Sequence, residues 1–481
     1  MTENNHEAPA SLGGLVLAGG QGKRMGSQGP KVLMRLLGEP MLFYIYQALS
    51  SVLSEEAIWT VVGYQREKLD SAFPHYASRF VHQQHQLGTG HALYCAYPIL
   101  RENGIRYCLV VNGDVPLVPP RALRDLQRKA LSQQTDVAFL TMRLAHPAGY
   151  GRVIRGEGDI VRRIAEEKDL EASEANVDEV NAGIYFLDLQ RIEPYLERMD
   201  QNNAQGEYYL PQLAEIAARE GGRVSAVCVE DGERELLGVN NPQELVYNEE
   251  ILSRRIAQHW LESGVIVRNP EQVRIGPRVS LQPGSELTGP LEIYGATRIG
   301  AQARVDSHVW ISDSTVAEGA WIRSFSHLEG ARVEQSAQVG PYARLRQAAV
   351  LKPESKVGNF VEVKKAVLGP ESKANHLAYI GDASVGSGAN IGAGCITCNY
   401  DGIAKHQTTI GDQAFIGSNV SLVAPLEIGA RAVVGAGSTI TKSVPDSFLA
   451  VARAKQKHLE RKPPKQEKDN GSTGQTGRKN T

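Results

Sequence analysis

An aliphatic residue recurs at every sixth position through the C-terminal half of the sequence, and this spacing constrains the fold more than any other feature. The first run goes from Ile275 to Ile311, the second from Val333 to Val363, and the third from Ile410 to Ile440. Glycine directly follows many of these positions, as at Gly300 and Gly417. A half-buried strand repeats every two residues and a helix every 3.6, so neither element explains the pattern.

A six-residue spacing predicts one short strand and one corner per repeat. Three repeats close a triangular coil, and stacked coils bury the aliphatic side chains along one internal axis. Glycine is expected at the tight corners, because it adopts positive φ without strain. The alternative is a β-sandwich, but the strands of a sandwich do not recur at one fixed spacing in the sequence. We therefore predict a parallel β-helix of about nine or ten coils. The repeat runs to about Val444, and the chain is expected to leave the coil after Pro445.

The length and charge of the chain limit the classes of protein to which it can belong. A chain of 481 residues is too long for one core, so two domains are expected. With 52 basic and 54 acidic residues, the net charge of -2 argues against nucleic-acid or membrane-surface partners. No stretch approaches the ~20 apolar residues of a membrane span, and the N-terminus resembles no signal peptide. A cytoplasmic protein is predicted.

The five cysteines are scattered and odd in number, which predicts reduced thiols rather than a disulfide framework. Cys395 and Cys398 have the spacing of a metal or redox pair. They lie inside the repeat and no second pair accompanies them, so we favour a structural role.

A short apolar strand runs into a glycine-rich, basic turn near the N-terminus, where residues 12–25 read LGGLVLAGGQGKRM. Glycine lets backbone N–H groups approach a phosphate closely, and Arg24 can bind one through two hydrogen bonds. The spacing is not that of a Walker motif. The turn indicates phosphate binding, with a plain glycine turn as the alternative.

Strands and helices alternate downstream. Strands are expected at 57–63 and 106–111, and helices at 41–53 and 120–132. This order predicts a parallel sheet with helices on both faces and a ligand site at the carboxyl ends of the strands. Asp114 follows one strand directly, where a carboxylate can hold a metal over a nucleotide. A turn or cap is the alternative.

Several segments match one family in its own order. Residues 17–25 and 30–33 resemble sugar-1-phosphate nucleotidyltransferases. The further matching segments are 83–92, 113–117, 149–152, 166–169, 181–184, 205–210, 238–241, 358–365 and 399–402. Over about residues 12–455 the chain resembles the bifunctional UDP-N-acetylglucosamine pyrophosphorylases / glucosamine-1-phosphate N-acetyltransferases. The resemblance implies a Rossmann-like α/β nucleotidyltransferase domain followed by a left-handed β-helix of hexapeptide repeats.

Two departures from the family pattern bear on the choice of base. The family has Leu-Ala-Ala-Gly where this chain has Leu-Ala-Gly-Gly at residues 17–20, and His85 stands where the family often has Glu. Residues 23–26 also resemble molybdopterin-cofactor nucleotidyltransferases, which use guanine nucleotides.

For the uridylyl site, the resemblance implies transfer from UTP to N-acetylglucosamine-1-phosphate, with Mg²⁺ held by Asp114 and Asn240. Uracil and ribose would meet Gln83, Gly88 and Thr89. Phosphate charge would be neutralised by Arg24 and Lys31, beside the turn formed by Leu17, Ala18, Gly19 and Gly20. The sugar would meet Gly151, Glu166, Asn181 and Asn240.

For the acetyl site, the resemblance implies transfer from acetyl-CoA to glucosamine-1-phosphate. An amine attacks only when neutral, so a base is required, and His376 is the natural candidate. Arg346 and Lys364 would bind the sugar phosphate. The sugar would meet Tyr379, Asn390 and Lys405. The CoA side would comprise Asn399, Tyr400, Ser418, Ala436 and Arg453.

The expected organisation is a flexible segment 1–11, a nucleotidyltransferase domain 12–241, a linker helix 242–263, the β-helix 264–455 and a disordered tail 456–481. The repeat falters between Ile391 and Ile410, and a loop that leaves a solenoid usually contacts something. Hexapeptide-repeat acyltransferases are trimers, so a homotrimer is implied, with the loop 397–409 reaching a neighbour's site.

Two other functions stay open. One is a single-activity sugar nucleotidyltransferase whose β-helix only oligomerises. The other is a non-catalytic, ligand-sensing scaffold. His376 and the Asn399-Tyr400 pair argue against the first, and the presence of both Asp114 and Asn240 argues against the second.

Overall fold

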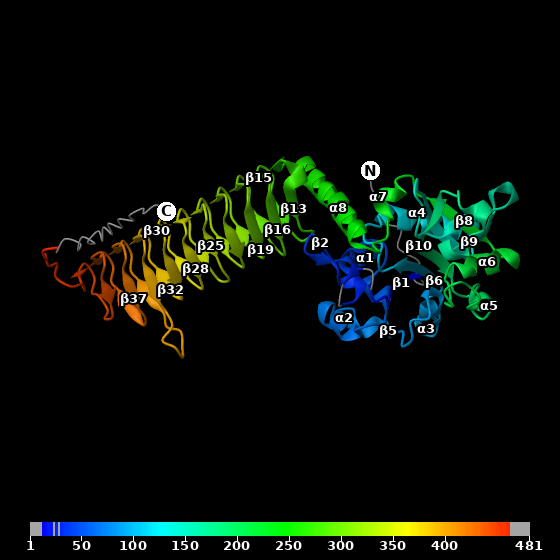
Figure 1. The fold of residues 1–481 in the computed structure, drawn as a ribbon, viewed down its shortest axis with the longest axis horizontal. Helices are drawn as coiled ribbons and strands as arrows, with labels where there is room; N and C mark the ends of the chain where they lie inside the picture. Colours follow the sequence, from blue (N-terminus) through cyan, green and yellow to red (C-terminus); the bar gives the residue numbers. More distant parts are fainter. Residues whose placement is uncertain (1–11, 23–24, 27–28, 462–481) are drawn as a thin grey trace, which may run out of the picture.

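The computed structural model describes residues 12–22, 25–26 and 29–461, and it shows two architectures in succession (Figure 1). An α/β unit is followed by one long helix and then by an elongated prism of stacked coils. Arg24, the segment 1–11 and most of the expected tail lie outside the described residues.

The α/β unit is built on one mixed sheet, in the order β11-β7-β10-β6-β1-β4-β5, with β8 and β9 attached through β10. Its strands are β1 (Leu12–Ala18), β4 (Ile58–Val62), β5 (Phe80–His82), β6 (Tyr107–Asn112), β7 (Val137–Arg143), β8 (Arg152–Arg155), β9 (Val161–Ala165), β10 (Glu179–Asp188) and β11 (Val224–Cys228). A small ribbon pairs β2 (Arg35–Leu36) with β3 (Glu39–Pro40).

The sheet is mixed rather than parallel as predicted: β1, β4, β5 and β6 pair in parallel, whereas β10 runs antiparallel to both β6 and β7. Parallel neighbours need a crossover, usually a helix. Between β7 and β10 the chain forms β8, β9 and short 3-10 turns but no α-helix that could serve as a crossover. The alternation of apolar residues in the sequence indicates which face of a strand is buried, but it does not indicate the direction in which the strand runs.

Helices cover both faces of this sheet. Residues of α1 (Met41–Ser50) and α4 (Pro120–Gln133) belong to the core on one face. Residues of α3 (Thr89–Glu102) and α6 (Gln212–Arg219) belong to the core on the other face. The remaining helices of the unit are α2 (Arg66–Ala72), α5 (Glu193–Leu196) and α7 (Gly232–Glu235).

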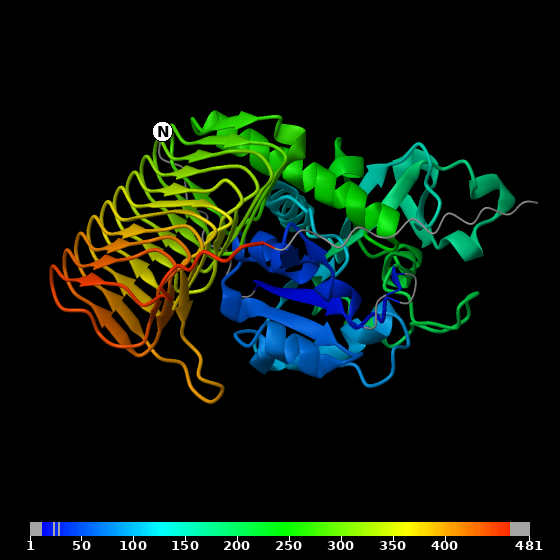
Figure 2. The ribbon, with the colours of Figure 1, turned by 60° about the vertical axis from the view of Figure 1, so that its left-hand side comes forward.

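Helix α8 (Pro242–Glu262) joins the two architectures, as Figure 2 shows. Asn241 caps it by accepting a hydrogen bond from the Glu244 amide at 2.9 Å, with proline in its first turn. Ile256 and Trp260 pack against the first coils. The Leu37 amide donates to Glu249 of α8 at 3.1 Å, so the helix contacts both units.

The prism has three parallel sheets, each contributed by one side of every coil. The first holds β12 (Ile266–Arg268), β15 (Glu286–Thr288), β18 (Arg304–Val305), β21 (Trp321–Ile322), β24 (Gln338–Val339), β27 (Lys356–Asn359), β30 (Lys373–His376), β33 (Asn390–Ile391), β36 (Phe415–Ile416), β39 (Val433–Val434) and β41 (Leu449–Ala450). The second holds β13 (Val273–Ile275), β16 (Leu291–Tyr294), β19 (Val309–Ser312), β22 (His327–Glu329), β25 (Arg344–Leu345), β28 (Glu362–Lys364), β31 (Tyr379–Gly381), β34 (Ile396–Cys398), β37 (Ser421–Val423) and β40 (Thr439–Ile440). The third holds β14 (Ser280–Leu281), β17 (Arg298–Ile299), β20 (Thr315–Val316), β23 (Arg332–Val333), β26 (Val350–Leu351), β29 (Val367–Leu368), β32 (Ala383–Val385), β35 (Thr408–Ile410) and β38 (Leu426–Ile428).

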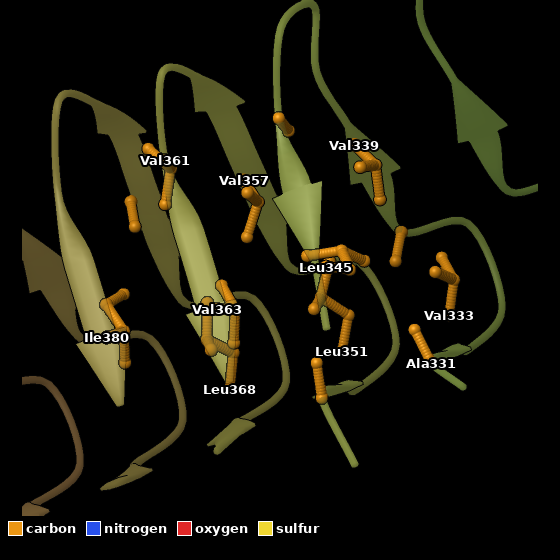
Figure 3. Close-up of a cluster of buried hydrophobic side chains, with 14 of the residues drawn as sticks. Ala331, Val333, Val339, Leu345, Leu351, Val357, Val361, Val363, Leu368 and Ile380 are labelled. Carbon is orange, nitrogen blue, oxygen red and sulfur yellow. The ribbon is translucent and has the colours of Figure 1, made fainter. Parts of the chain in front are cut away.

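This is the arrangement of a left-handed β-helix with hexapeptide repeats, and the predicted fold class is confirmed. The recurring aliphatic side chains point inward and form one continuous core, part of which Figure 3 shows. Register pairs Leu281 with Ile299, and Ile299 with Val316. Apart from the coil that carries the loop 397–409, where Val385 pairs with Ile410, such coils hold 18 or 17 residues, and the shorter coils explain why the spacing slips.

The positive φ predicted for the repeat glycines is found at Gly340 but not at most of the glycines that directly follow an aliphatic position. Positive-φ corners are occupied mostly by other residues, such as Phe325 and Tyr342. Gly300 and Gly417 instead lie where neighbouring coils approach closely. A Cβ on Gly300 would be 2.6 Å from the amide nitrogen of Glu318, and one on Gly417 would be 2.5 Å from that of Ala436. These glycines are required by backbone contact between coils.

The solenoid also extends further than its spacing predicted. Beyond Pro445, strand β41 pairs in parallel with β39 through Leu449 and Ala450. The six-residue spacing did not predict this final strand, because its Leu449 is exposed rather than buried. Within the described part of the chain, no helix is long and apolar enough to cross a membrane.

Candidate functional sites

A cavity of about 290 Å³ opens at the carboxyl ends of β1 and β6. It is lined by Leu17, Gly19, Gly20, Lys31, Val32, Gln83, Gln86, Gly88, Thr89, Ala92, Asn112, Gly113, Asp114 and Glu207. An adjoining cavity of about 540 Å³ shares four of these residues and adds Gln21, Gly22 and Asn240. Eight of the predicted uridylyl-site residues therefore line one hollow, and Asn240 lines its extension.

Lys31 lies between the two predicted metal ligands. Its ammonium donates to Asp114 Oδ2 at 2.6 Å and to Asn240 Oδ1 at 2.8 Å. Asp114 follows β6, and Asn240 immediately precedes the cap of α8. A carboxylate oxygen and an amide oxygen thus converge on a single cation, which is the donor chemistry that Mg²⁺ prefers. The pair fits a divalent metal.

The glycine-rich turn leaves the wall of the cavity without side chains. A Cβ on Gly19 would lie 2.8 Å from Gln83 Oε1, so only glycine fits there beside an unmoved Gln83. The turn is closed by a hydrogen bond from the Met25 amide to the Gly22 carbonyl at 2.9 Å. Ala18 is buried in the core and does not line the cavity.

The opposite wall is held by the chain around Tyr208. The Tyr208 amide donates to Leu87 O at 2.8 Å, and the Gly90 amide donates to Tyr208 O at 2.8 Å. Thr89 Oγ accepts from the Leu210 amide at 3.1 Å. These contacts fix Gly88 and Thr89 at the start of α3, facing the glycine-rich turn.

The three remaining sugar-site candidates form a group of their own outside the lining of these cavities. The Asn181 amide donates to Gly151 O at 2.9 Å, and a Cβ on Gly151 would lie 3.3 Å from Glu166 Oε1. Asn181 Nδ2 also donates to the buried Tyr185 hydroxyl at 2.6 Å. Burial, and then the nearby Asp169 and Glu207, raises the pKa of Glu166. Because Glu207 lines both cavities, it connects this group to them.

His376 lies on the outer surface of the prism, at the end of β30. Its Nδ1 is 2.5 Å from Asn359 Oδ1, on the preceding coil. An amide oxygen only accepts, so Nδ1 carries the proton and Nε2 keeps its lone pair. The imidazole is exposed and is oriented for proton acceptance at Nε2.

Three cations, Arg346, Lys364 and Lys405, lie close to one another on the prism. The neighbouring Lys405, and then Arg346, lower the pKa of Lys364. Arg346 donates to Glu362 Oε1 at 2.9 Å, which partly offsets its charge. Two of the three come from β25–β28, whereas Lys405 comes from the loop that breaks the repeat. The cluster presents the charge that a phosphate monoester would neutralise.

The break in the repeat is a projecting loop, seen beyond the prism below β32 and β37 in Figure 1. Thr397 still occupies the inward position and is 2% exposed, whereas Ile403 at the loop is 93% exposed. Asn399 Nδ2 donates to Asp382 Oδ2 at 2.5 Å, and Tyr400 pairs with Lys405 across the loop. His406 lies 2.7 Å from Asp401 and lowers its pKa, after the larger effect of the Ala404 amide.

The remaining acetyl-site candidates lie on neighbouring coils. Tyr379 is on β31, and Asn390 is on β33, next to the strand that carries His376. At the far end, Arg453 donates to Ala436 O at 2.9 Å, and the Gly437 amide donates to Ser418 O at 2.8 Å. Ser418, Ala436 and Arg453 therefore form one contiguous strip. Cys395 belongs to the buried core, and burial raises the pKa of its thiol to about 12.

Comparison with known proteins matches this pair of sites. A family profile described as "MobA-like NTP transferase domain" matches residues 14–173, and one described as "Bacterial transferase hexapeptide (six repeats)" matches residues 407–442. The chain is 48% identical over 462 residues to the bifunctional protein GlmU of Oleidesulfovibrio alaskensis, covering 95% of this chain and 99% of that protein. The GlmU of Nitratidesulfovibrio vulgaris strain Miyazaki F is 49% identical over 94% of this chain and 98% of that protein. That of Lawsonia intracellularis is 42% identical over 93% and 97%.

The chain belongs to the GlmU family. The family expected from the motifs is confirmed, together with its two transferase domains. The likeness to GlmU proteins covers both sites, since the aligned region spans nearly the whole chain.

Reasoning from sequence missed several residues that line these sites. Gln86 and Glu207 line both N-terminal cavities, and Asn112 lines the first. Asn359 orients His376. All four lie within or directly beside segments that match the GlmU family, so the signal was present. Which residue of a segment faces a cavity depends on strand register, and the motif does not show it.

Proposed function

We propose that the chain makes UDP-N-acetylglucosamine for the cell envelope in two steps at separate sites, using glucosamine-1-phosphate, acetyl-CoA and UTP. As a GlmU-family protein it is an N-acetylglucosamine-1-phosphate uridylyltransferase and a glucosamine-1-phosphate N-acetyltransferase. The observation that carries the assignment of residues is the convergence of Asp114 and Asn240 in one domain, with an oriented, exposed His376 in the other.

At the N-terminal site, a phosphate oxygen of N-acetylglucosamine-1-phosphate attacks the α-phosphorus of UTP, and pyrophosphate leaves. Such a reaction depends on positioning and on neutralisation of charge. Gly19 and Gly20 leave room for phosphates against the backbone, and Lys31 supplies a positive charge. Gln83, Gly88 and Thr89 would contact the nucleoside. Gly151, Glu166 and Asn181 would bind the sugar.

Mg²⁺ would be held by Asp114 and Asn240, where it would offset the charge developing on the phosphates. The converging oxygens support this assignment. Lys31 would turn from these two residues toward a phosphate when the metal and nucleotide enter together.

At the C-terminal site, the amine of glucosamine-1-phosphate attacks the thioester carbonyl of acetyl-CoA. A C–N bond forms, the C–S bond breaks, and the thiolate of CoA leaves. His376 Nε2 accepts the proton that the nitrogen loses. Arg346, Lys364 and Lys405 would neutralise the sugar phosphate, and Tyr379 and Asn390 would contact the sugar. Asn399, Tyr400, Ser418, Ala436 and Arg453 would form the CoA side.

A homotrimer would complete the C-terminal site, because His376 and its sequence neighbours are exposed on the surface of a single prism. Two features support contact with another copy. The loop 397–409 projects from the coil. A ladder of stacked rings, His308, Phe325, Tyr342 and Phe360, runs along one corner with centroids 4.7 to 5.3 Å apart. It leads to the exposed Leu377, beside His376, and its rings line part of a groove of about 880 Å³. The protein is proposed to act in the cytoplasm.

Two-step turnover by the purified chain tests this proposal. Glucosamine-1-phosphate, acetyl-CoA and UTP are expected to give UDP-N-acetylglucosamine, with stoichiometric free thiol and pyrophosphate. Pyrophosphate release only from added N-acetylglucosamine-1-phosphate would favour the single-activity enzyme. Absence of both products would favour a binding scaffold.

A further inference from the structure

The side-chain amide of Gln83 is oriented by two partners on the wall of the nucleotide cavity. Gln83 is 3% exposed. Its Nε2 lies 3.1 Å from Gly88 O and 3.0 Å from His91 Nδ1. A carbonyl oxygen only accepts, so the NH₂ end of the amide faces Gly88. The second N–H then points to His91, whose Nδ1 acts as the acceptor.

His91 is suited to accept this hydrogen bond. It lies in the first turn of α3, and Cys95 Sγ, one turn further along the helix, is 3.8 Å from its Nε2 and 3.9 Å from its Nδ1. The tautomer protonated on Nε2 satisfies both contacts. Burial, and then the neighbouring His85, lowers the pKa of the imidazole, which favours the neutral form.

The two hydrogen bonds use both N–H groups of the amide, so Oε1 is left to face the cavity. It lies toward Gly19, where an added Cβ would be 2.8 Å away. An oxygen in this position accepts hydrogen bonds and cannot donate. Uracil presents an N–H at N3, whereas cytosine presents a lone pair there. A buried acceptor that meets a lone pair stays unpaired and is repelled.

We propose that His91 is a positioning residue that sets the pyrimidine selectivity of the nucleotide site by fixing which end of the Gln83 amide faces the base. This inference rests on the proposed uridylyltransferase function and deepens it. His91 itself does not line the cavity, so it acts through Gln83.

Three variants separate positioning from structural support. In His91→Leu the leucine fills a similar volume but offers no hydrogen-bond acceptor to Gln83. Asn in His91→Asn places an oxygen where Nδ1 stood. Cys95→Ser alters the sulfur neighbour of the imidazole and keeps the imidazole itself, with its Nδ1 acceptor, in place. The measurements are kcat/KM for UTP and for CTP with N-acetylglucosamine-1-phosphate, and calorimetric binding of both nucleotides.

The expected result is a UTP/CTP preference that falls about tenfold in His91→Leu, the value of roughly one hydrogen bond. His91→Asn and Cys95→Ser are expected to keep the wild-type ratio. An unchanged ratio in His91→Leu would overturn the proposal, as would equal loss in the Leu and Asn variants. If the wild-type protein binds UTP more tightly than CTP but shows no turnover, the proposed function is refuted. The effect of each variant on nucleotide selectivity is then measured by binding alone.

Discussion

Replacing His376 should separate the two activities of the chain. In His376→Ala the amine loses its proton acceptor, and a positioned general base is worth about 10²- to 10⁴-fold in rate. We expect kcat for acetyl transfer to fall by at least 10²-fold, with uridylyl transfer unchanged. Thiol release from acetyl-CoA and pyrophosphate release from UTP, measured on one preparation, give the two rates.

The hydrogen bond from His376 to Asn359 allows a finer test. In Asn359→Leu the imidazole loses the acceptor that fixes its tautomer, a net effect of about 1 kcal/mol, or roughly five- to tenfold in rate. In Asn359→Asp a carboxylate faces Nδ1 and stabilises the imidazolium, which cannot act as a base. The acid limb of acetyl transfer should therefore move to higher pH in the Asp variant only.

Equal loss of both activities in His376→Ala would refute the reasoning, because it would mean that the substitution damaged the whole chain. Retention of more than about a hundredth of the acetyl-transfer rate would also refute it, since the loss would then be smaller than the least effect expected of a general base. A pH profile unmoved by Asn359→Asp would show that Asn359 does not orient the imidazole in the reaction.

Other outcomes follow from the metal ligands, the buried carboxylate and the coil spacing. Asp114→Ala should abolish Mg²⁺-dependent pyrophosphate release and spare acetyl transfer; retained release would contradict the metal assignment. Burial first, and then Asp169 and Glu207, raises the pKa of Glu166, so kcat/KM for uridylyl transfer should begin to fall with decreasing pH above the ordinary glutamate value of about 4.3. That limb should be missing from Glu166→Gln, and its persistence there would assign it to another group. Gly300→Ala should lower the stability of the β-helix by about 1–3 kcal/mol, because the added methyl meets backbone; calorimetry showing a raised melting temperature would mean that the coils can separate.

The β-helix was predictable from sequence because its core places one aliphatic residue at each strand, and that requirement appears directly as spacing. The role of the glycines was not predictable. Positive φ and close backbone approach both select glycine, and only the positions of adjacent coils distinguish them, as Gly300 shows. The strand β41 was missed for a related reason, since a terminal coil needs no buried residue at every step.

The N-terminal candidate residues came from matched segments, and most of them line one cavity. Contacts across the fold could not be inferred in this way. The proximity of Asn359 and His376 depends on a coil of 17 residues, and that of Gln83 and His91 depends on where α3 begins. The antiparallel direction of β10 likewise depends on a connection without a crossover helix.

The stacking of the coils has a kinetic consequence. His376 lies six strands beyond the first coil in its sheet, which at ~4.8 Å per strand places it about 30 Å along the prism from the end that α8 covers. The nucleotidyltransferase unit lies beyond that end (Figure 1). With the acetyl site at His376, as proposed, the acetylated intermediate is expected to pass through bulk solvent between the two sites. The flux through both steps would then depend on how far the intermediate is diluted and on what else in solution consumes it first.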